Sequence, residues 1–153
     1  MLFKHFSCRH HADSVFNIWR KSDIVATMAS GSAQVTRETL TELALFEGLI
    51  RRMPDDIDVL KSLADLYTRV GRYEDGLALD RTLAQLCPDD QLIWYNLGCS
   101  WALVRRQTEA IDALAHAIEL GYRDWQWMQK DEDLRTLRND SRFASLLKQL
   151  VAK

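Results

Sequence analysis

Neither a long apolar run nor an excess of one charge is found in this sequence. Its 153 residues carry 20 lysines and arginines against 22 aspartates and glutamates, which gives a formal net charge of -2. Such a balance provides no electrostatic reason to bind nucleic acid or an acidic membrane surface. Residues 1–21 contain no apolar stretch long enough for a signal peptide or a transmembrane helix. We therefore expect no nucleic-acid partner and no membrane partner.

Cysteine is scarce as well, with Cys8, Cys87 and Cys99 as its three occurrences. The number is odd and no pair has C-x-x-C spacing, so we predict free thiols, a reducing compartment and a cytoplasmic location. A structural zinc site is not expected. Cys8 lies near three histidines, but the adjacent His10 and His11 lack the usual spacing of metal ligands. We therefore predict no metal centre in this part of the chain.

Motifs of the common enzyme classes are absent. The sequence contains no Gly-rich phosphate loop, no H-E-x-x-H and no G-x-S-x-G. The acidic run from Asp131 to Asp133 lacks the glycine and the downstream glutamate of a calcium loop. His116 is the one histidine beyond residue 11, and we expect it to point to solvent. We therefore predict no catalytic residues, no cofactor and no enzymatic activity.

What the sequence does contain is a helical pattern, between residues 54 and 122, that repeats at an offset of about 34 positions. Residues of the same class recur at this offset. The matched pairs are Leu60 with Trp94, Leu63 with Leu97, Ala64 with Gly98, Tyr67 with Trp101, Gly76 with Ala110, and Leu77 with Ile111. Self-similarity of this length is typical of a solenoid, in which each unit buries its apolar face against the next.

The second unit carries a recognisable motif at Trp94, Leu97, Gly98, Trp101, Ala110, Leu114 and Ala117. On these residues the sequence resembles the tetratricopeptide repeat family, whose unit is a helix-turn-helix of about 34 residues. The resemblance implies an all-α fold, a right-handed α-solenoid of such units. Small residues such as Gly76 and Gly98 would let two helices approach closely, which offsets the cost of about 1 kcal/mol for glycine inside a helix.

Two residues depart from the family pattern. Asp80 stands where the family prefers a large apolar residue, and Tyr122 stands where it prefers proline. An unpaired carboxylate between packed helices would cost about 2–5 kcal/mol. We therefore expect Asp80 either to reach solvent or to have a basic partner.

The periodicity also predicts how the chain is divided. Apolar residues recur at three and four from Leu40 to Met53, and Thr39 with Glu42 is spaced as a capping box, which indicates a terminal half-repeat helix with a polar outer face. In the C-terminal third the repeat is broken, Trp125 and Trp127 are interpreted as core aromatics, and Asp140 caps a last helix. The predicted divisions are an N-terminal tail (1–36), the half-repeat helix (37–53), repeat 1 (57–88), repeat 2 (91–122) and an end cap (123–153).

The N-terminal tail is the least informative part. We expect residues 1–36 to be poorly ordered or weakly helical. A short amphipathic helix around Trp19 would either pack on the array or act as an organelle-targeting sequence, and Met28 is an alternative natural start.

In the resembled family, partners bind the concave surface that is lined by the first helix of each unit. Carried onto this sequence, the lining residues are Asp58, Lys61, Asp65, Thr68, Arg69, Leu92, Tyr95, Asn96, Cys99 and Ala102. Lys61 and Asn96 match two positions of a carboxylate clamp found in some relatives, but Asp65 would repel a carboxylate. The resemblance therefore implies a non-catalytic scaffold that binds an extended or helical peptide or protein segment. The alternative is an assembly subunit, a homo-oligomer whose groove is filled by its own tail or by a second copy.

Charges are segregated between the two kinds of connection. The entries to the first helices carry Asp55, Asp56, Asp89, Asp90 and Asp124, and the turns within the units carry Arg69, Arg72, Arg105 and Arg106. We interpret the aspartates as helix caps and the arginines as partners of helix ends. The alternative is that the arginine edge also docks a charged partner.

Overall fold

The computed structural model describes residues 35–151, and within this range every regular element is a helix. The prediction of an all-α protein is therefore confirmed for the described residues, whereas the predictions on residues 1–34 lie outside them. None of the described helices is long and apolar enough to cross a bilayer. The elements are α1 (Arg37–Ile50), α2 (Ile57–Arg69), α3 (Tyr73–Leu86), α4 (Gln91–Leu103), α5 (Gln107–Glu119), α6 (Trp125–Lys130), the 3-10 helix η4 (Glu132–Leu137) and α7 (Ser141–Val151).

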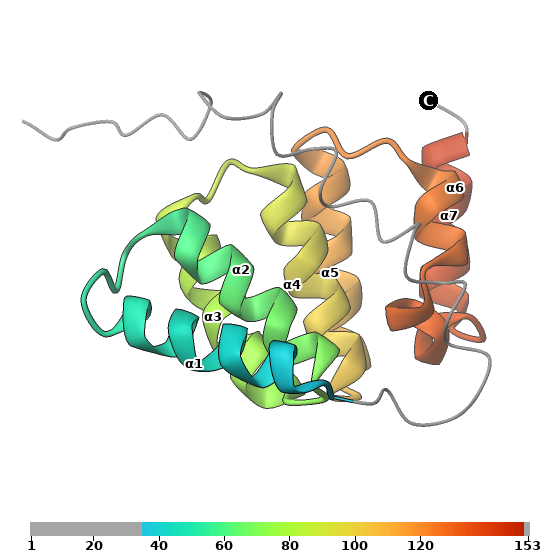
Figure 1. Cartoon of the computed structure of the whole chain (residues 1–153). Coiled ribbons are helices and arrows are strands. Elements are labelled where there is room, and N and C mark those ends of the chain that lie inside the picture. The colour runs from blue at the N-terminus through green and yellow to red at the C-terminus, as the bar shows by residue number, and fades with distance from the viewer. Residues whose placement is uncertain (1–34, 152–153) are drawn as a thin grey trace, which may run out of the picture. The chain divides into compact units, whose positions relative to one another are not determined.

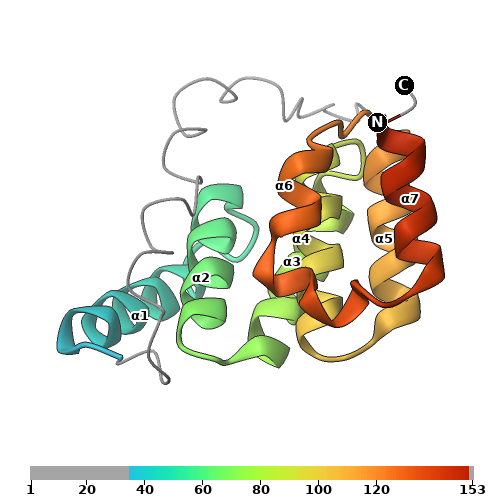
Figure 2. The same ribbon diagram turned by 90° about the vertical axis from the view of Figure 1, so that its right-hand side faces the viewer.

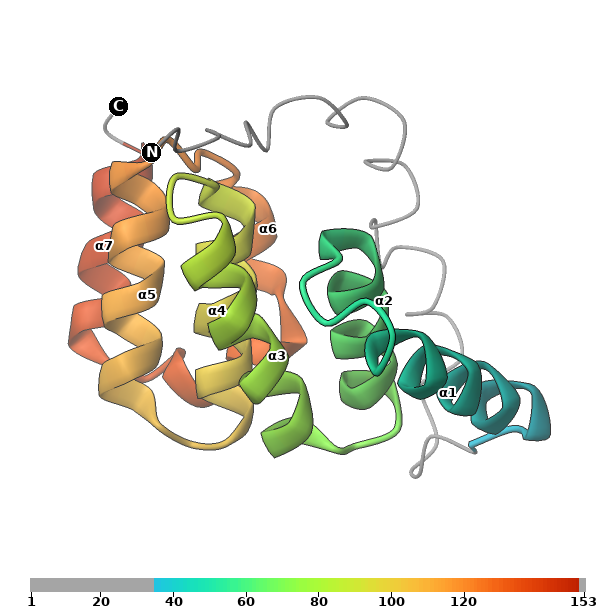
Figure 3. The ribbon, with the colours of Figure 1, turned by 90° about the vertical axis from the view of Figure 1, so that its left-hand side faces the viewer.

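From α1 to α5, helices that follow one another in the chain pack as neighbours. Helices α2 to α5 lie side by side in chain order, with short turns between them (Figures 1 and 3). Helix α1 runs across this stack at one side, and α6, η4 and α7 cover the other side (Figure 2). The predicted repeat 1 thus contains α2 and α3, and repeat 2 contains α4 and α5.

The same helix cap recurs three times at the start of a helix. The carboxylate of Asp56 accepts from the backbone N–H of Val59 at 3.0 Å, and Asp90 accepts from the N–H of Leu92 at 2.9 Å. Asp124 accepts from the N–H of Trp127 at 2.9 Å. Each carboxylate satisfies a backbone donor that has no partner inside its helix. The interpretation as caps is therefore confirmed for these three aspartates, whereas Asp55 and Asp89, which precede two of them, are not the capping residues.

The turns within the two units share one backbone geometry. Gly71 (φ 80°) and Arg105 (φ 63°) both adopt the left-handed conformation. In each turn the next residue returns a hydrogen bond to the preceding helix, from Arg72 N to Tyr67 O at 2.8 Å and from Arg106 N to Trp101 O at 2.9 Å. This is the usual way to satisfy the last carbonyls of a helix, and glycine adopts it most easily. Arg105 makes the same turn at a cost of about 1–2 kcal/mol.

Two expectations about α1 need correction. The helix is capped by Thr36, whose hydroxyl accepts from the Thr39 N–H at 3.2 Å, so Thr39 is not the capping residue. Leu43 is buried against α2, but Leu40 and Leu45 are 54% and 59% exposed, and the prediction of a polar outer face is wrong at these two positions. The helix is therefore apolar on more than the side that covers α2.

Apolar side chains of the end cap complete the core of the second unit. Met128, Leu134 and Leu137 are fully buried, and Phe143 is 2% exposed, in a cluster with residues of α4 and α5. Trp125 and Trp127 pack against the same cluster, as expected for core aromatics. At the start of α7, Asp140 accepts from the backbone N–H of Arg142 at 2.8 Å, as predicted. The last three helices are thus one continuous cover over α4 and α5.

Asp80 is buried at the boundary between the two units. Its side chain on α3 is 6% exposed and accepts a hydrogen bond at 2.5 Å from the hydroxyl of Ser100 on α4. The expectation that Asp80 reaches solvent is wrong, and one of its hydrogen-bond donors is the neutral hydroxyl of Ser100. This polar contact joins the second helix of one unit to the first helix of the next.

Two helical glycines occupy different surroundings. A Cβ atom at Gly98 would lie 2.7 Å from Leu114 Cγ and 3.3 Å from Ala110 O, because α4 and α5 cross closely there. A Cβ atom at Gly76 would meet its nearest neighbours, Ala64 O and Thr68 Oγ1, at 3.4 Å. The close approach predicted for both glycines is therefore tight only at Gly98.

We expect Gly98→Ala to lower the free energy of unfolding by about 1–3 kcal/mol, since the added methyl overpacks the α4–α5 contact. Gly76→Ala is the matched control: we expect it to be neutral or to stabilise by about 0.5–1 kcal/mol, because alanine is the better helix former. Urea unfolding followed by far-UV circular dichroism measures both. Equal effects of the two substitutions would contradict the packing assigned to Gly98.

Candidate functional site

The α2 half of the predicted groove is accessible. Asp58 and Arg69 are exposed, and Lys61, Asp65 and Thr68 are half-buried. Arg69 Nη1 lies 4.0 Å from an Asp65 oxygen and 3.8 Å from Glu42 on α1. The stripe therefore alternates in charge along one face of the helix, with its charges partly matched to one another.

The α4 half of the predicted groove is largely closed. Leu92 is exposed and Asn96 is half-buried, but Tyr95, Cys99 and Ala102 are 4%, 5% and 0% exposed. These three residues belong to the core cluster that the end cap completes, where η4 packs on α4. Their interpretation as groove-lining residues is therefore wrong in this structure.

The residues beneath the end cap form a buried polar network that the sequence did not reveal. Asp131, 5% exposed, accepts from the Tyr95 hydroxyl at 2.8 Å through one carboxylate oxygen. The other oxygen accepts from the backbone N–H of Asp133 at 3.0 Å and so caps η4. The Cys99 thiol lies 3.8 Å from the first oxygen. Asp131 falls where the repeat breaks, so the sequence pattern did not indicate that its carboxylate holds η4 against α4.

Two tyrosines stack within this network. The rings of Tyr95 and Tyr122 lie with centroids 4.5 Å apart and are nearly parallel. Burial raises the pKa of both phenols above the ordinary value of 10.0, and the nearby Asp131 carboxylate acts in the same direction on each. Both tyrosines therefore stay neutral while the fold is intact.

Among the described residues, one group of side chains could bind a metal ion: Cys99, Asp131 and Asp133. Their donor atoms lie within 4.8 Å of one another. However, both oxygens of Asp131 already accept hydrogen bonds, and the arrangement is fully explained by the attachment of η4 to α4. We interpret it as a structural network. Of the other cysteines, Cys87 is disulfide-bonded, so the expectation of a free thiol is wrong there and holds for Cys99.

Arg72, in the turn between α2 and α3, contacts other residues of the same chain. Arg72 binds Glu47 of α1 at 2.7 Å and Asp75 of α3 at 2.6 Å, and its guanidinium lies over the ring of Tyr67. The Tyr67 hydroxyl donates to the same Glu47 at 3.1 Å. Arg72 thus helps to hold α1 on the stack, a role different from the helix-end partnership that we predicted.

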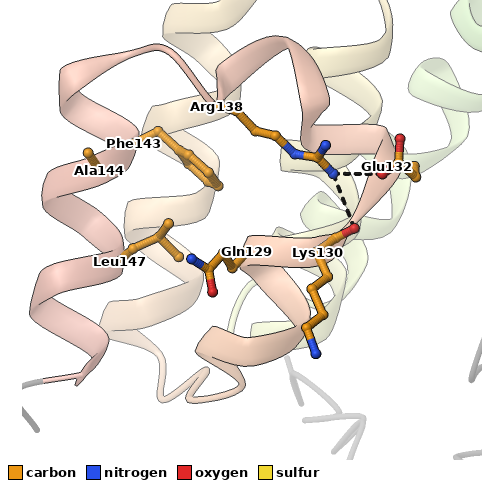
Figure 4. Close-up of a pocket in the computed structure, with 7 residues that line it drawn as sticks. All are labelled: Gln129, Lys130, Glu132, Arg138, Phe143, Ala144 and Leu147. Atoms are coloured by element: carbon orange, nitrogen blue, oxygen red, sulfur yellow. Dashed lines mark hydrogen bonds and ion pairs between the residues drawn. The ribbon is translucent and has the colours of Figure 1, made fainter.

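A surface pocket of about 520 Å³ lies between α6 and α7 (Figure 4). Its apolar wall comes from α7, and its rim carries an ion pair in which Arg138 donates to Glu132 at 2.7 Å. Arg138 also donates to the backbone carbonyl of Lys130 at 3.3 Å. The lining residues are Gln129, Lys130, Glu132, Arg138, Phe143, Ala144 and Leu147. None of them is a cysteine, serine, threonine or histidine.

The tyrosine network makes stability dependent on alkaline pH. Folding favours the neutral phenols of Tyr95 and Tyr122, so their contribution is complete below about pH 10 and is lost as the pH rises further. We expect tyrosinate absorbance to appear together with loss of helix. Tyr95→Phe should cost about 1–2 kcal/mol at neutral pH and should weaken the alkaline dependence. Tyr73→Phe, at an exposed ring, is the control and should change neither.

Comparison with known proteins gives limited information. No family model matches the sequence. Part of the chain is similar to a chloroplast protein of Arabidopsis thaliana, with 29% identity over 86 residues. The matched region covers 54% of this chain and 26% of that protein, so the chain spans about a quarter of the length of this relative.

Proposed function

We propose that this chain is a right-handed tetratricopeptide-type α-solenoid that acts as a non-catalytic scaffold for a protein or peptide partner. The observation that supports it best is the repetition of local structure at corresponding positions. The caps Asp56 and Asp90 recur at the same offset as the left-handed turn residues Gly71 and Arg105. Sequence, helix starts and turns therefore follow one repeat, and repeat arrays generally bind extended partners along a surface.

The proposed contact surface is smaller than the one expected from the sequence. With Tyr95, Cys99 and Ala102 covered, it comprises Asp58, Lys61, Asp65, Thr68, Arg69, Leu92 and Asn96. This surface offers both signs of charge, an amide and one exposed apolar side chain. A segment with mixed polar and apolar side chains suits it better than a strongly acidic or purely apolar one.

The location of the protein is also a proposal. We propose a cytoplasmic protein because the sequence has no C-x-x-C spacing and Cys99 forms no disulfide; the disulfide at Cys87 is the observation against this location. The name of the similar plant protein places that protein in the chloroplast, which favours an organelle interior as the alternative. Fluorescence microscopy of the full chain with a C-terminal tag distinguishes the two locations.

To test the groove proposal, the protein is immobilised on a support and exposed to a lysate of its source organism. The proteins that bind are then quantified by mass spectrometry. We expect the double variant Lys61→Ala, Asn96→Ala to lose a specific partner at least tenfold, equivalent to about 1.4 kcal/mol. Arg81→Ala, Gln85→Ala on the exposed face of α3 is the matched control and should retain the partner. Circular dichroism of all variants should be alike. A partner held equally by both double variants would refute the groove assignment.

A second candidate is favoured by the exposed leucines of α1. Leu40 and Leu45 leave apolar surface at one side of the stack, which a second copy of the chain could bury in an assembly subunit. The monomer mass is 17.7 kDa. A stable dimer in sedimentation that dissociates in Leu40→Glu, Leu45→Glu, combined with no groove-dependent partner, would support this function over the scaffold.

A further inference from the structure

The turn between α4 and α5 contains a backbone conformation that its side chain does not favour. Arg105 has φ 63°, and among the described residues it is the one residue other than glycine with a positive φ. At the corresponding position of the first unit, Gly71 makes the same turn with φ 80°. The chain itself thus provides the comparison: glycine is sufficient for this geometry, and the arginine adds steric strain.

No contact within the described residues compensates for this strain. The side chain of Arg105 is exposed and makes no ion pair, hydrogen bond or ring contact within residues 35–151. Its neighbour behaves differently, since Arg106 is ion-paired with Glu109 and lies near the ring of Trp101. Arg72, which follows Gly71 in the other unit, is also paired. Of the two turns, the second therefore presents a guanidinium that has no partner in the described part of the chain.

A second guanidinium of this kind lies on η4, next to the α4–α5 turn. The side chain of Gln107 donates to the backbone carbonyl of Thr136 at 3.2 Å, and the Thr136 hydroxyl donates to Ala102 O at 3.2 Å. These two bonds hold the α4–α5 turn against the end of η4. The α4–α5 turn and η4 lie at the same end of the stacked helices (Figure 2). Arg135 of η4 is exposed and its side chain has no partner among the described residues.

We propose that Arg105 and Arg135 form a docking surface for an acidic segment of a protein partner, separate from the α2–α4 groove. Guanidinium groups bind carboxylates through two parallel hydrogen bonds, so a pair of them on fixed turns matches a segment with neighbouring glutamates or aspartates. Glu109 and Asp140 lie near this surface, and the net charge of the whole chain is -2. These acidic groups disfavour long polyanions such as nucleic acid and restrict the surface to a short acidic segment.

The substitution Arg105→Gly distinguishes a role in docking from a role in folding. We expect it to weaken binding of the acidic segment and to raise the stability of the fold. As probe we choose the acetylated hexaglutamate peptide, titrated into isotope-labelled full-length protein and followed by NMR. We expect amide shifts at the two turns, at least fivefold weaker binding by Arg105→Gly and by Arg135→Gln, and a melting temperature of Arg105→Gly that rises by roughly 3–6 °C. Arg81→Gln on α3 removes the same charge from an exposed site and should leave both properties unchanged.

Several results would overturn the proposal. Binding that is equal in Arg105→Gly and Arg81→Gln, shifts that map away from the two turns, or no binding by the unaltered protein would each show that this surface does not recognise acidic segments. A lower melting temperature for Arg105→Gly would assign the arginine a structural role. Tighter binding of a single-stranded hexanucleotide at the same amides would replace the acidic segment by nucleic acid as the occupant.

Discussion

The structure depends on one constraint: a pair of helices in this stack can bury only one apolar face by itself, so each exposed face needs a neighbour. The second unit meets this requirement through α6, η4 and α7, which place fully buried Met128, Leu134 and Leu137 against it. The first unit is flanked by α1 and by α4. Helix caps and turn geometry determine where each helix begins and ends, but this mutual covering determines which helices are adjacent.

The same covering decides how much surface remains for a partner. The face of α4 that would complete a concave groove is the face on which η4 rests, and the buried Asp131 fixes η4 there through Tyr95. The accessible surface is therefore displaced toward α2, where Asp58 and Arg69 are exposed and Lys61, Asp65 and Thr68 are half-buried. Stability of the second unit and breadth of the proposed groove thus depend on the same residues of α4.

The repeat, the helix starts and the all-α class were predictable because they depend on local chemistry. An aspartate before an apolar helix accepts from free N–H groups wherever it occurs, and Asp56, Asp90 and Asp124 did so. The burial of Tyr95 was not predictable, because it results from a segment whose sequence no longer follows the repeat and still occupies the next position in the stack. The Asp80–Ser100 contact was missed for a related reason: pairing across two helices requires their relative register. The left-handed conformation of Arg105 could have been predicted from the sequence, since its offset from Gly71 equals the repeat length.

The buried contact between Asp80 and Ser100 also determines the order of the units. At the position that corresponds to Asp80 the second unit has Leu114, and at the position that corresponds to Ser100 the first unit has Leu66. Two copies of the first unit in tandem would place a buried carboxylate against a leucine, and two copies of the second would leave a buried hydroxyl facing one. The two units are therefore neither interchangeable nor suited to simple duplication. An array extended by duplication of either unit would lack this hydrogen bond at the new boundary between the units.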